Sequence, residues 1–184
     1  MAVTGQYEAA TSPVVLCISV PAIPVAMPRQ RHRVVRTKAG RVFAQNYTPS
    51  DAPVHTFKAT CRQAAAALYD GAPLAGPLMV EILLLFPRPG RLRWKSRPMP
   101  RDWHQARPDA ENCAKAVLDA LTGLLWVDDK QVTDLRVQKC YAAGDEQPHV
   151  KIVVRELLSE QLPNEELGAG LLWSEQVKGS ERYV

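Results

Sequence analysis

The fold is decided by one apolar stretch, Leu78-Met-Val-Glu-Ile-Leu-Leu-Leu-Phe86, which lies between Pro77 and Pro87. Glu81 alone interrupts its hydrophobic run. A short apolar run bounded by prolines is typical of a buried strand, because proline cannot donate to the hydrogen-bond ladder inside a sheet. We therefore expect a central strand over residues 78–86.

Two extended segments precede this strand. Residues 14–20 carry apolar side chains at nearly every position, which predicts a mostly buried strand that ends at the following prolines. Residues 29–41 contain six cations and no acid, and Lys38-Ala-Gly-Arg41 is typical of a hairpin tip. This segment predicts a basic β-ribbon.

Two helices are predicted from capping signals. The first runs from about Thr56 to Tyr69, with Ser50 or Asp51 as its N-cap. The second runs from about Ala110 to Thr122 and is stopped by Gly123.

The C-terminal half ends in two apolar strands. Residues 132–141 and 149–155 have strand character, and we expect them to form a hairpin across residues 142–148. The order of elements predicts an α+β fold, with a mixed or antiparallel sheet and two main helices.

Length and charge indicate one domain with two tails. The chain of 184 residues is long enough for one core, which we place at residues 13–156, between a flexible N-terminus (1–12) and an acidic C-terminal tail (157–184). Residues 160–184 hold five acids against two bases, a charge of −3, so the overall charge of +4 leaves +7 on residues 1–159. A basic domain favours a polyanionic partner such as nucleic acid.

Cysteines, histidines and hydropathy exclude other classes of protein. The four cysteines have no CxxC spacing and no nearby histidine, so we expect buried free thiols and no zinc site. The uncharged stretch Ala9 to Pro28 is broken by prolines, so neither an export signal nor a membrane helix is expected. These features predict a soluble cytoplasmic protein.

Two basic segments are candidates for DNA binding: the ribbon, and a proline-rich loop over residues 88–101 that also contains Trp94. Cations interleaved with aromatic rings favour contact with phosphates and unstacked bases. The alternative is a flexible, solvated excursion of the chain. The predicted DNA-binding residues are Arg29, Arg31, Arg33, Arg36, Lys38, Arg41, Arg88, Arg91, Arg93, Lys95, Arg97 and Arg101.

Acidic residues occur at two points suited to a metal. Asp109 and Glu111 begin the second helix, with Lys115 on the same face, and Asp128 and Asp129 form a turn able to fold back toward the helix start. Three converging carboxylates suit Mg²⁺, which would polarise a phosphate and activate water. The plain alternative is a helix cap with favourable charge at the helix dipole, plus a surface turn.

The run Arg107-Pro-Asp-Ala-Glu-Asn-Cys-Ala-Lys115, followed by Asp128-Asp-Lys-Gln-Val132, resembles the RusA family of Holliday junction resolvases. That family has a D-x-D-N-x-x-K helix followed by a D-D-x-Q-V turn. The similarity spans roughly residues 14–156, but only residues 107–137 are specific.

The resemblance implies a function and a site. Asp109, Glu111 and Asp129 would bind Mg²⁺, with Mn²⁺ able to substitute, and Lys115 would be the essential lysine. It further implies an intertwined homodimer that resolves four-way DNA junctions by symmetric paired cuts during recombination and repair. Two active sites need two subunits, which favours twofold symmetry.

The sequence departs from the family pattern at Glu111, where the family has aspartate, and in its long basic loop. One alternative is therefore a branched-DNA binding protein with weak or lost catalysis, and another is a general metal-dependent phosphohydrolase or RNA-directed enzyme. Asp128 could be either an outer metal-site group or a turn-forming residue. Asp119 is interpreted as a packing partner of Lys115.

Overall fold

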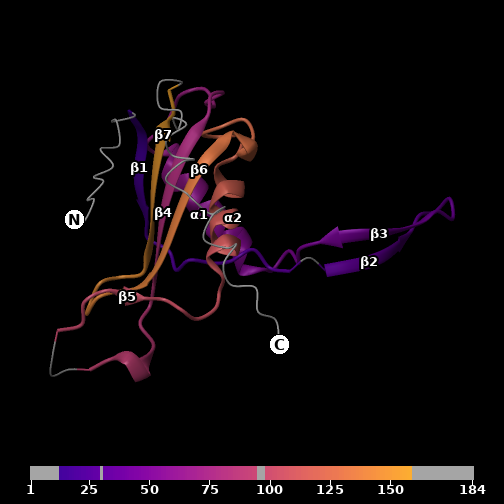
Figure 1. Ribbon diagram of the computed structural model, residues 1–184. Helices are drawn as coiled ribbons and strands as arrows, with labels where there is room; N and C mark the ends of the chain where they lie inside the picture. The colour runs from indigo at the N-terminus through magenta and orange to yellow at the C-terminus, as the bar shows by residue number, and fades with distance from the viewer. Residues whose placement is uncertain (1–12, 30, 95–97, 159–184) are drawn as a thin grey trace, which may run out of the picture.

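A computed structural model describes residues 13–29, 31–94 and 98–158. It confirms the α+β fold with a mixed sheet and two main helices (Figure 1). The predicted N-terminal segment 1–12 and most of the acidic tail lie outside the described residues. In chain order the elements are β1 (Val14–Val20), β2 (Arg31–Arg36), β3 (Val42–Tyr47), α1 (Pro53–Ala66), β4 (Leu78–Phe86), η1 (Gly90–Leu92), β5 (Asp102–Trp103), α2 (Ala110–Leu121), η2 (Asp129–Gln131), β6 (Val132–Tyr141) and β7 (His149–Glu156).

The main sheet has the strand order β1-β7-β4-β6-β5, with β4 at its centre as predicted. β6 runs parallel to β4 on one side, and β7 runs antiparallel to β4 on the other. The predicted hairpin of the last two strands is therefore wrong. β4 is apolar on both faces and takes a neighbour along each edge, so the chain after Tyr141 crosses to the far side of β4 instead of turning back on β6.

The two helices pack against each other on one face of the sheet. α2 buries Cys113, Ala116, Val117 and Leu121, and these side chains join the buried face of β4 in one core. The other face of the sheet is mixed: it contains apolar side chains of β4, and Glu81 of β4 forms ion pairs there with Arg136 of β6 and Arg155 of β7. α2 is thus held firmly along its length, and its first turn lies at one end of this layer.

α1 begins earlier than predicted. Its N-cap is Ala52 and Pro53 occupies the first turn, so neither Ser50 nor Asp51 caps it. The reason is that the ring of proline fixes a helical φ and needs no hydrogen-bond acceptor at this position, which makes a polar cap dispensable.

β2 and β3 form the predicted basic ribbon as a separate two-stranded sheet (Figure 1). The ribbon extends away from the main sheet and the helices, and its tip turns at Gly40, whose φ of 80° suits glycine. The cations of the ribbon are exposed to solvent, namely Arg31, Arg33, Arg36, Lys38 and Arg41.

Among the described residues, no helix combines the length and the apolar character needed to cross a membrane.

Candidate active site

Asp109 stands at the start of α2 without acting as a side-chain cap. Its backbone is extended, at φ −71° and ψ 144°, and its side chain makes no capping hydrogen bond. Its main-chain oxygen accepts from the N–H of Cys113 at 3.2 Å and so begins the helix. The Asp109 side chain therefore does not cap α2. Its carboxylate is exposed and remains available for another partner.

Lys139 of β6 holds the loop before Asp109. Its Nζ atom donates to the main-chain oxygens of Ala106, at 2.8 Å, and Pro108. The main-chain N–H of His104 donates to the Lys139 oxygen at 3.1 Å. The end of β6 therefore fixes the position at which α2 begins.

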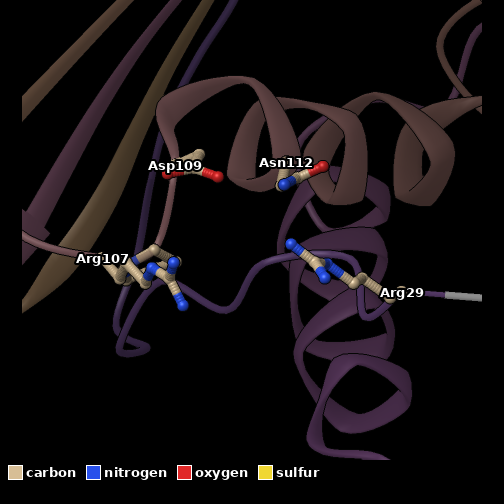
Figure 2. Close-up of a pocket in the computed structure, with 5 residues that line it drawn as sticks. Arg29, Arg107, Asp109 and Asn112 are labelled. Carbon is tan, nitrogen blue, oxygen red and sulfur yellow. The ribbon is translucent and has the colours of Figure 1, made fainter.

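An open pocket of about 430 Å³ lies beside Asp109, lined by Arg29, Arg107, Pro108 and Asn112. Figure 2 shows Arg107 and Arg29 reaching toward the same space from two separate chain segments, with Asp109 and Asn112 above them on the helix. The segment that carries Arg29 is tied to α2, because the N–H of Met27 donates to the Asn112 main-chain oxygen at 2.9 Å. The pocket thus joins two cations to one carboxylate.

Glu111 and Lys115 are exposed on the first turns of α2. Within the described part of the chain neither side chain has a hydrogen-bond or ion-pair partner. Asp119, further along the helix, bonds to Lys58 of α1, with its Oδ2 atom 3.1 Å from Nζ. The interpretation of Asp119 as a partner of Lys115 is therefore wrong, because α1 packs against α2 and presents a lysine there.

The Asp128-Asp129 turn is built around a capping box. The Asp128 side chain accepts from the Lys130 N–H at 3.0 Å, and Oε1 of Gln131 accepts from the Asp128 N–H at 3.0 Å. The hydrogen bond from the Lys130 N–H lowers the pKa of Asp128. Gln131 also donates to the main-chain oxygens of Leu74 and Gly76, which anchors the turn to the segment before β4. Asp128 therefore forms the turn, while Asp129 is exposed.

The turn does not fold back to the start of α2 within one chain. Lys139, which touches Pro108, is seven residues along β6 from Val132, a distance of roughly 23 Å in a strand. α2 likewise separates the two ends by about 17 Å. Among residues 13–29, 31–94 and 98–158, no three His, Cys, Asp or Glu side chains lie close enough to hold a metal ion. One chain therefore places Asp109 and Glu111 at the start of α2 and Asp129 toward its opposite end.

The predicted DNA-binding cations have different surroundings. Arg88 is only 5% exposed, and its guanidinium donates to the oxygens of Ala142 and Pro100 and stacks 5.6 Å from the Trp94 ring centre. Arg101 pairs with Glu146, at 2.5 Å between Nη2 and Oε1. Arg33 bonds to Gln45 yet stays exposed. Lys95 and Arg97 lie outside the described residues. Arg88 is a structural residue of the loop and does not face solvent.

Three residues near Asp109 were missed from the sequence: Arg107, Asn112 and Lys139. The position of Arg107, two residues before Asp109, and of Asn112, in the same helical turn, could have indicated the first two. Nothing local marks Lys139, because the pairing of β5 with β6 brings it near the segment before Asp109.

The cysteines agree only in part with the expectation of buried thiols. Cys61 and Cys113 are buried, and burial raises their pKa values to about 12 and about 11. Cys17 is exposed and Cys140 is half-buried. Cys17 is exposed because it points to the face of the sheet opposite the core side chains of β1.

Comparison with known proteins agrees with the sequence motif. An uncharacterized protein of Bacillus subtilis (strain 168), YqaN, is 45% identical over 51 residues, which cover 28% of this chain and 34% of that protein. The match thus spans about a third of that relative's length. The family described as endodeoxyribonuclease RusA matches residues 21–155, most of the chain and all of the elements from β2 to β6. The chain therefore belongs to the RusA family of endodeoxyribonucleases.

Proposed function

We propose that this protein is a Mg²⁺-dependent endodeoxyribonuclease that resolves four-way DNA junctions by paired, symmetric cuts during recombination and repair. The observation that carries the proposal is the exposed carboxylate of Asp109, which makes no capping hydrogen bond, in a pocket with Arg29 and Arg107. A phosphodiester is an anion, and two guanidinium groups beside an acid provide both phosphate contacts and a ligand for a cation.

The residues at the start of α2 fit a hard divalent cation. Asp109 and Glu111 provide carboxylate oxygens, the ligands that such a cation prefers. Among the described residues, no cysteine or histidine lines the pocket. Asp109, Glu111 and Asp129 would hold the ion, and a site with all three needs more than one chain. When bound, such an ion polarises the phosphate and lowers the pKa of a bound water.

The protein's own side chains orient the phosphate. Arg107 and Arg29 bind its non-bridging oxygens from two sides of the pocket, and the Lys139 contacts keep Arg107 and Asp109 at a fixed separation. Lys115, one turn after Glu111, is placed to offset the negative charge that develops as the bond to the leaving oxygen breaks. Pre-oriented charges of this kind act because they need no rearrangement during the reaction.

Binding to the branched substrate is assigned to the exposed ribbon cations and to Arg91 and Arg93 of the loop. Paired cuts in opposite strands require two active sites, which supports a homodimer. The ribbon extends from the chain immediately after Arg29, so DNA held along it would lead to the pocket.

The test is incubation of the purified protein with a mobile four-way junction, a linear duplex of the same sequence and an RNA duplex, each with and without Mg²⁺. The expected result is paired nicking of the junction only, dependent on Mg²⁺ and abolished by Asp109→Asn and by Asp129→Asn. Junction binding without cutting would favour the DNA-binding alternative. Equal cleavage of the three substrates would favour a general phosphohydrolase.

A further inference from the structure

A second pocket of about 430 Å³ lies between the basic loop, residues 88–101, and the turn that joins β6 to β7. Trp94 and Met99 are among the residues that line it from the loop, and residues 144–148 line it from the turn. Among the described residues, it shares no lining with the pocket at the start of α2. The basic loop therefore encloses a cavity of its own in addition to carrying cations.

Hydrogen bonds hold the two sides of this second pocket together. The Gly144 N–H donates to the Met99 main-chain oxygen at 2.9 Å. Nε of the buried Arg88 donates to the Ala142 oxygen at 3.1 Å, and the same guanidinium lies over the Trp94 ring, 5.6 Å from its centre. The pocket is thus formed before any ligand arrives, so a ligand would lose little free energy to ordering its walls.

The lining combines an aromatic ring with charged groups of both signs. Trp94 and Met99 are half-buried, whereas Arg93 and Asp145 are exposed. A nucleobase suits this combination, because its flat face stacks on an aromatic ring and its edge forms hydrogen bonds with carboxylate and guanidinium groups. The Asp145 carboxylate disfavours a phosphate inside the pocket, whereas Arg93 can bind the phosphate of the same nucleotide.

The pocket lies near the candidate active site. Ala142, which lines it, directly follows the end of β6. Lys139, which bonds to the Pro108 oxygen beside Asp109, is three residues earlier, about 10 Å along the strand. Figure 1 shows β5, which follows the basic loop, and the start of α2 at the same end of the main sheet. A DNA strand that passes Asp109 would therefore reach the pocket within about three nucleotides, at roughly 3.4 Å each.

We propose, on the basis of the DNA substrate proposed above, that the pocket between the basic loop and the β6–β7 turn binds one unstacked nucleobase close to the cut. The Trp94 ring stacks on the base, Arg93 binds its phosphate, and Asp145 accepts a hydrogen bond from the base edge. Stacking is interrupted where the arms of a junction meet, so a base leaves the helix more easily there than inside a duplex. The pocket would therefore favour branched over linear DNA.

Binding of short single strands tests the pocket without Mg²⁺ and without cleavage. The probes are a labelled oligothymidine and an abasic strand of the same length, which keeps the sugars and phosphates. The wild type should bind oligothymidine more tightly, and Trp94→Ala should weaken this binding by about 5- to 150-fold, the range for one base–aromatic stack. The abasic strand should bind both proteins equally. Unchanged oligothymidine affinity in Trp94→Ala would overturn the proposal.

Two further variants separate stacking from folding, with thermal unfolding measured on each. Trp94→Phe keeps an aromatic ring and should retain most of the preference for oligothymidine. Trp103→Ala removes a tryptophan that is 63% exposed on β5 and does not line the pocket, so it should leave the preference unchanged. If Trp103→Ala abolished the preference and Trp94→Ala preserved it, the base would stack elsewhere and the proposal would fail.

Gly144→Leu should block the pocket without removing a contact. Gly144 lines the pocket, and a Cβ at this position would meet no other atom within 4 Å. The variant should bind the two strands equally and unfold at the wild-type temperature. Gly90→Leu is the matched control, because this position is equally open but outside the pocket lining, and it should keep the preference. A folded Gly144→Leu protein that still prefers oligothymidine would contradict the proposed pocket.

Junction cleavage, measured on the same preparations, separates this proposal from the proposed function. If the wild type prefers oligothymidine but does not cut, the proposed function fails and the pocket stands. If it cuts and binds both strands equally, the pocket fails and the nuclease stands. In a protein that cuts, one abasic residue within about three nucleotides of the cut should slow the wild type and leave Trp94→Ala unaffected. Equal slowing of both proteins would argue against a base in this pocket.

Discussion

The ammonium group of Lys139 donates a hydrogen bond to the main-chain oxygen of Pro108 and thereby couples the end of β6 to the residue before Asp109. A second bond from the same atom reaches the Ala106 oxygen at 2.8 Å. The position of Asp109 is therefore controlled by a residue thirty positions away in the sequence.

Lys139→Met should lower both stability and cleavage. The change leaves two carbonyl oxygens without their charged donor, at a cost of about 1–3 kcal/mol in the free energy of unfolding. The loop before Asp109 loses its anchor, so cleavage should fall by a larger factor than junction affinity. Urea unfolding and single-turnover cleavage measure the two effects. Lys151→Met, an exposed lysine of β7, is the matched control and should change neither.

The elements of the fold could be predicted from local patterns, but the pairing of the strands could not. The sequence of Leu78–Phe86 predicts a central strand because this stretch is apolar on both faces. The last two strands could pair with each other, or one could pair with each edge of β4. Contacts between segments that are distant in the sequence decide between these two arrangements. The loop between Tyr141 and His149 is long enough for both arrangements, so periodicity carries no information on the choice.

The residues of the candidate site could be proposed from the sequence, but their assembly could not. Lys115 follows Glu111 by four positions, so helix spacing predicts that both lie on one face of α2. The distance from Asp129 to this pair depends on the direction of β6 relative to α2, which spacing cannot encode. Arg88 illustrates a second limit, since a basic run shows which residues are cations and not which of them is buried.

Asp119→Asn should separate a structural acid from a catalytic one. Asp119 and Lys58 are each about a quarter exposed and join α2 to α1, so the loss should cost no more than about 1 kcal/mol of stability. Junction cleavage should stay at the wild-type rate, whereas Asp109→Asn should abolish cleavage and leave stability unchanged. Thermal unfolding and cleavage assays on both variants check this. A loss of cleavage in Asp119→Asn at wild-type stability would place Asp119 in the site.

Arg36→Gln and Arg88→Gln should act on different properties. Arg36 is exposed on the ribbon, so its loss should reduce the slope of log affinity against log salt by about 0.9 for one phosphate contact. Arg88 is buried and bonded to two carbonyl oxygens, so its loss should destabilise the protein by about 1–3 kcal/mol and leave the slope unchanged. Fluorescence anisotropy over a range of salt concentrations measures the slopes. Equal slope changes in both variants would indicate that Arg88, like Arg36, contacts a DNA phosphate.

The Arg101–Glu146 pair predicts a loss of stability in acid. The hydrogen bond from Arg101 holds the pKa of Glu146 below its ordinary value of 4.5. The pair therefore stabilises the fold fully above that value, and the contribution disappears as pH falls through the lower folded-state pKa. Since Arg101 is 46% exposed, the effect should not exceed about 1 kcal/mol. The stability difference between wild type and Glu146→Gln, measured by urea unfolding, should shrink on acidification. Asp145→Asn controls for the loss of one negative charge alone. A stability difference between wild type and Glu146→Gln that is constant with pH would contradict a contribution of the Arg101–Glu146 pair to stability.

Arg107→Met should lower the rate of cutting more than the affinity for the junction. In the proposed function Arg107 is one of many cations that attract DNA, but it also shares a pocket with Asp109. Negative charge would develop on the phosphate there during the proposed reaction. Loss of such a preorganised contact typically lowers kcat by about 10²-fold. Single-turnover cleavage at saturating protein isolates this effect, and Arg36→Met, on the exposed ribbon, should instead weaken binding and leave the saturated rate unchanged. Arg107→Lys should recover part of the rate because the charge returns without the two-pronged geometry of the guanidinium. An Arg107→Met enzyme that cuts at the wild-type rate once saturated would reduce Arg107 to a simple anchor for DNA.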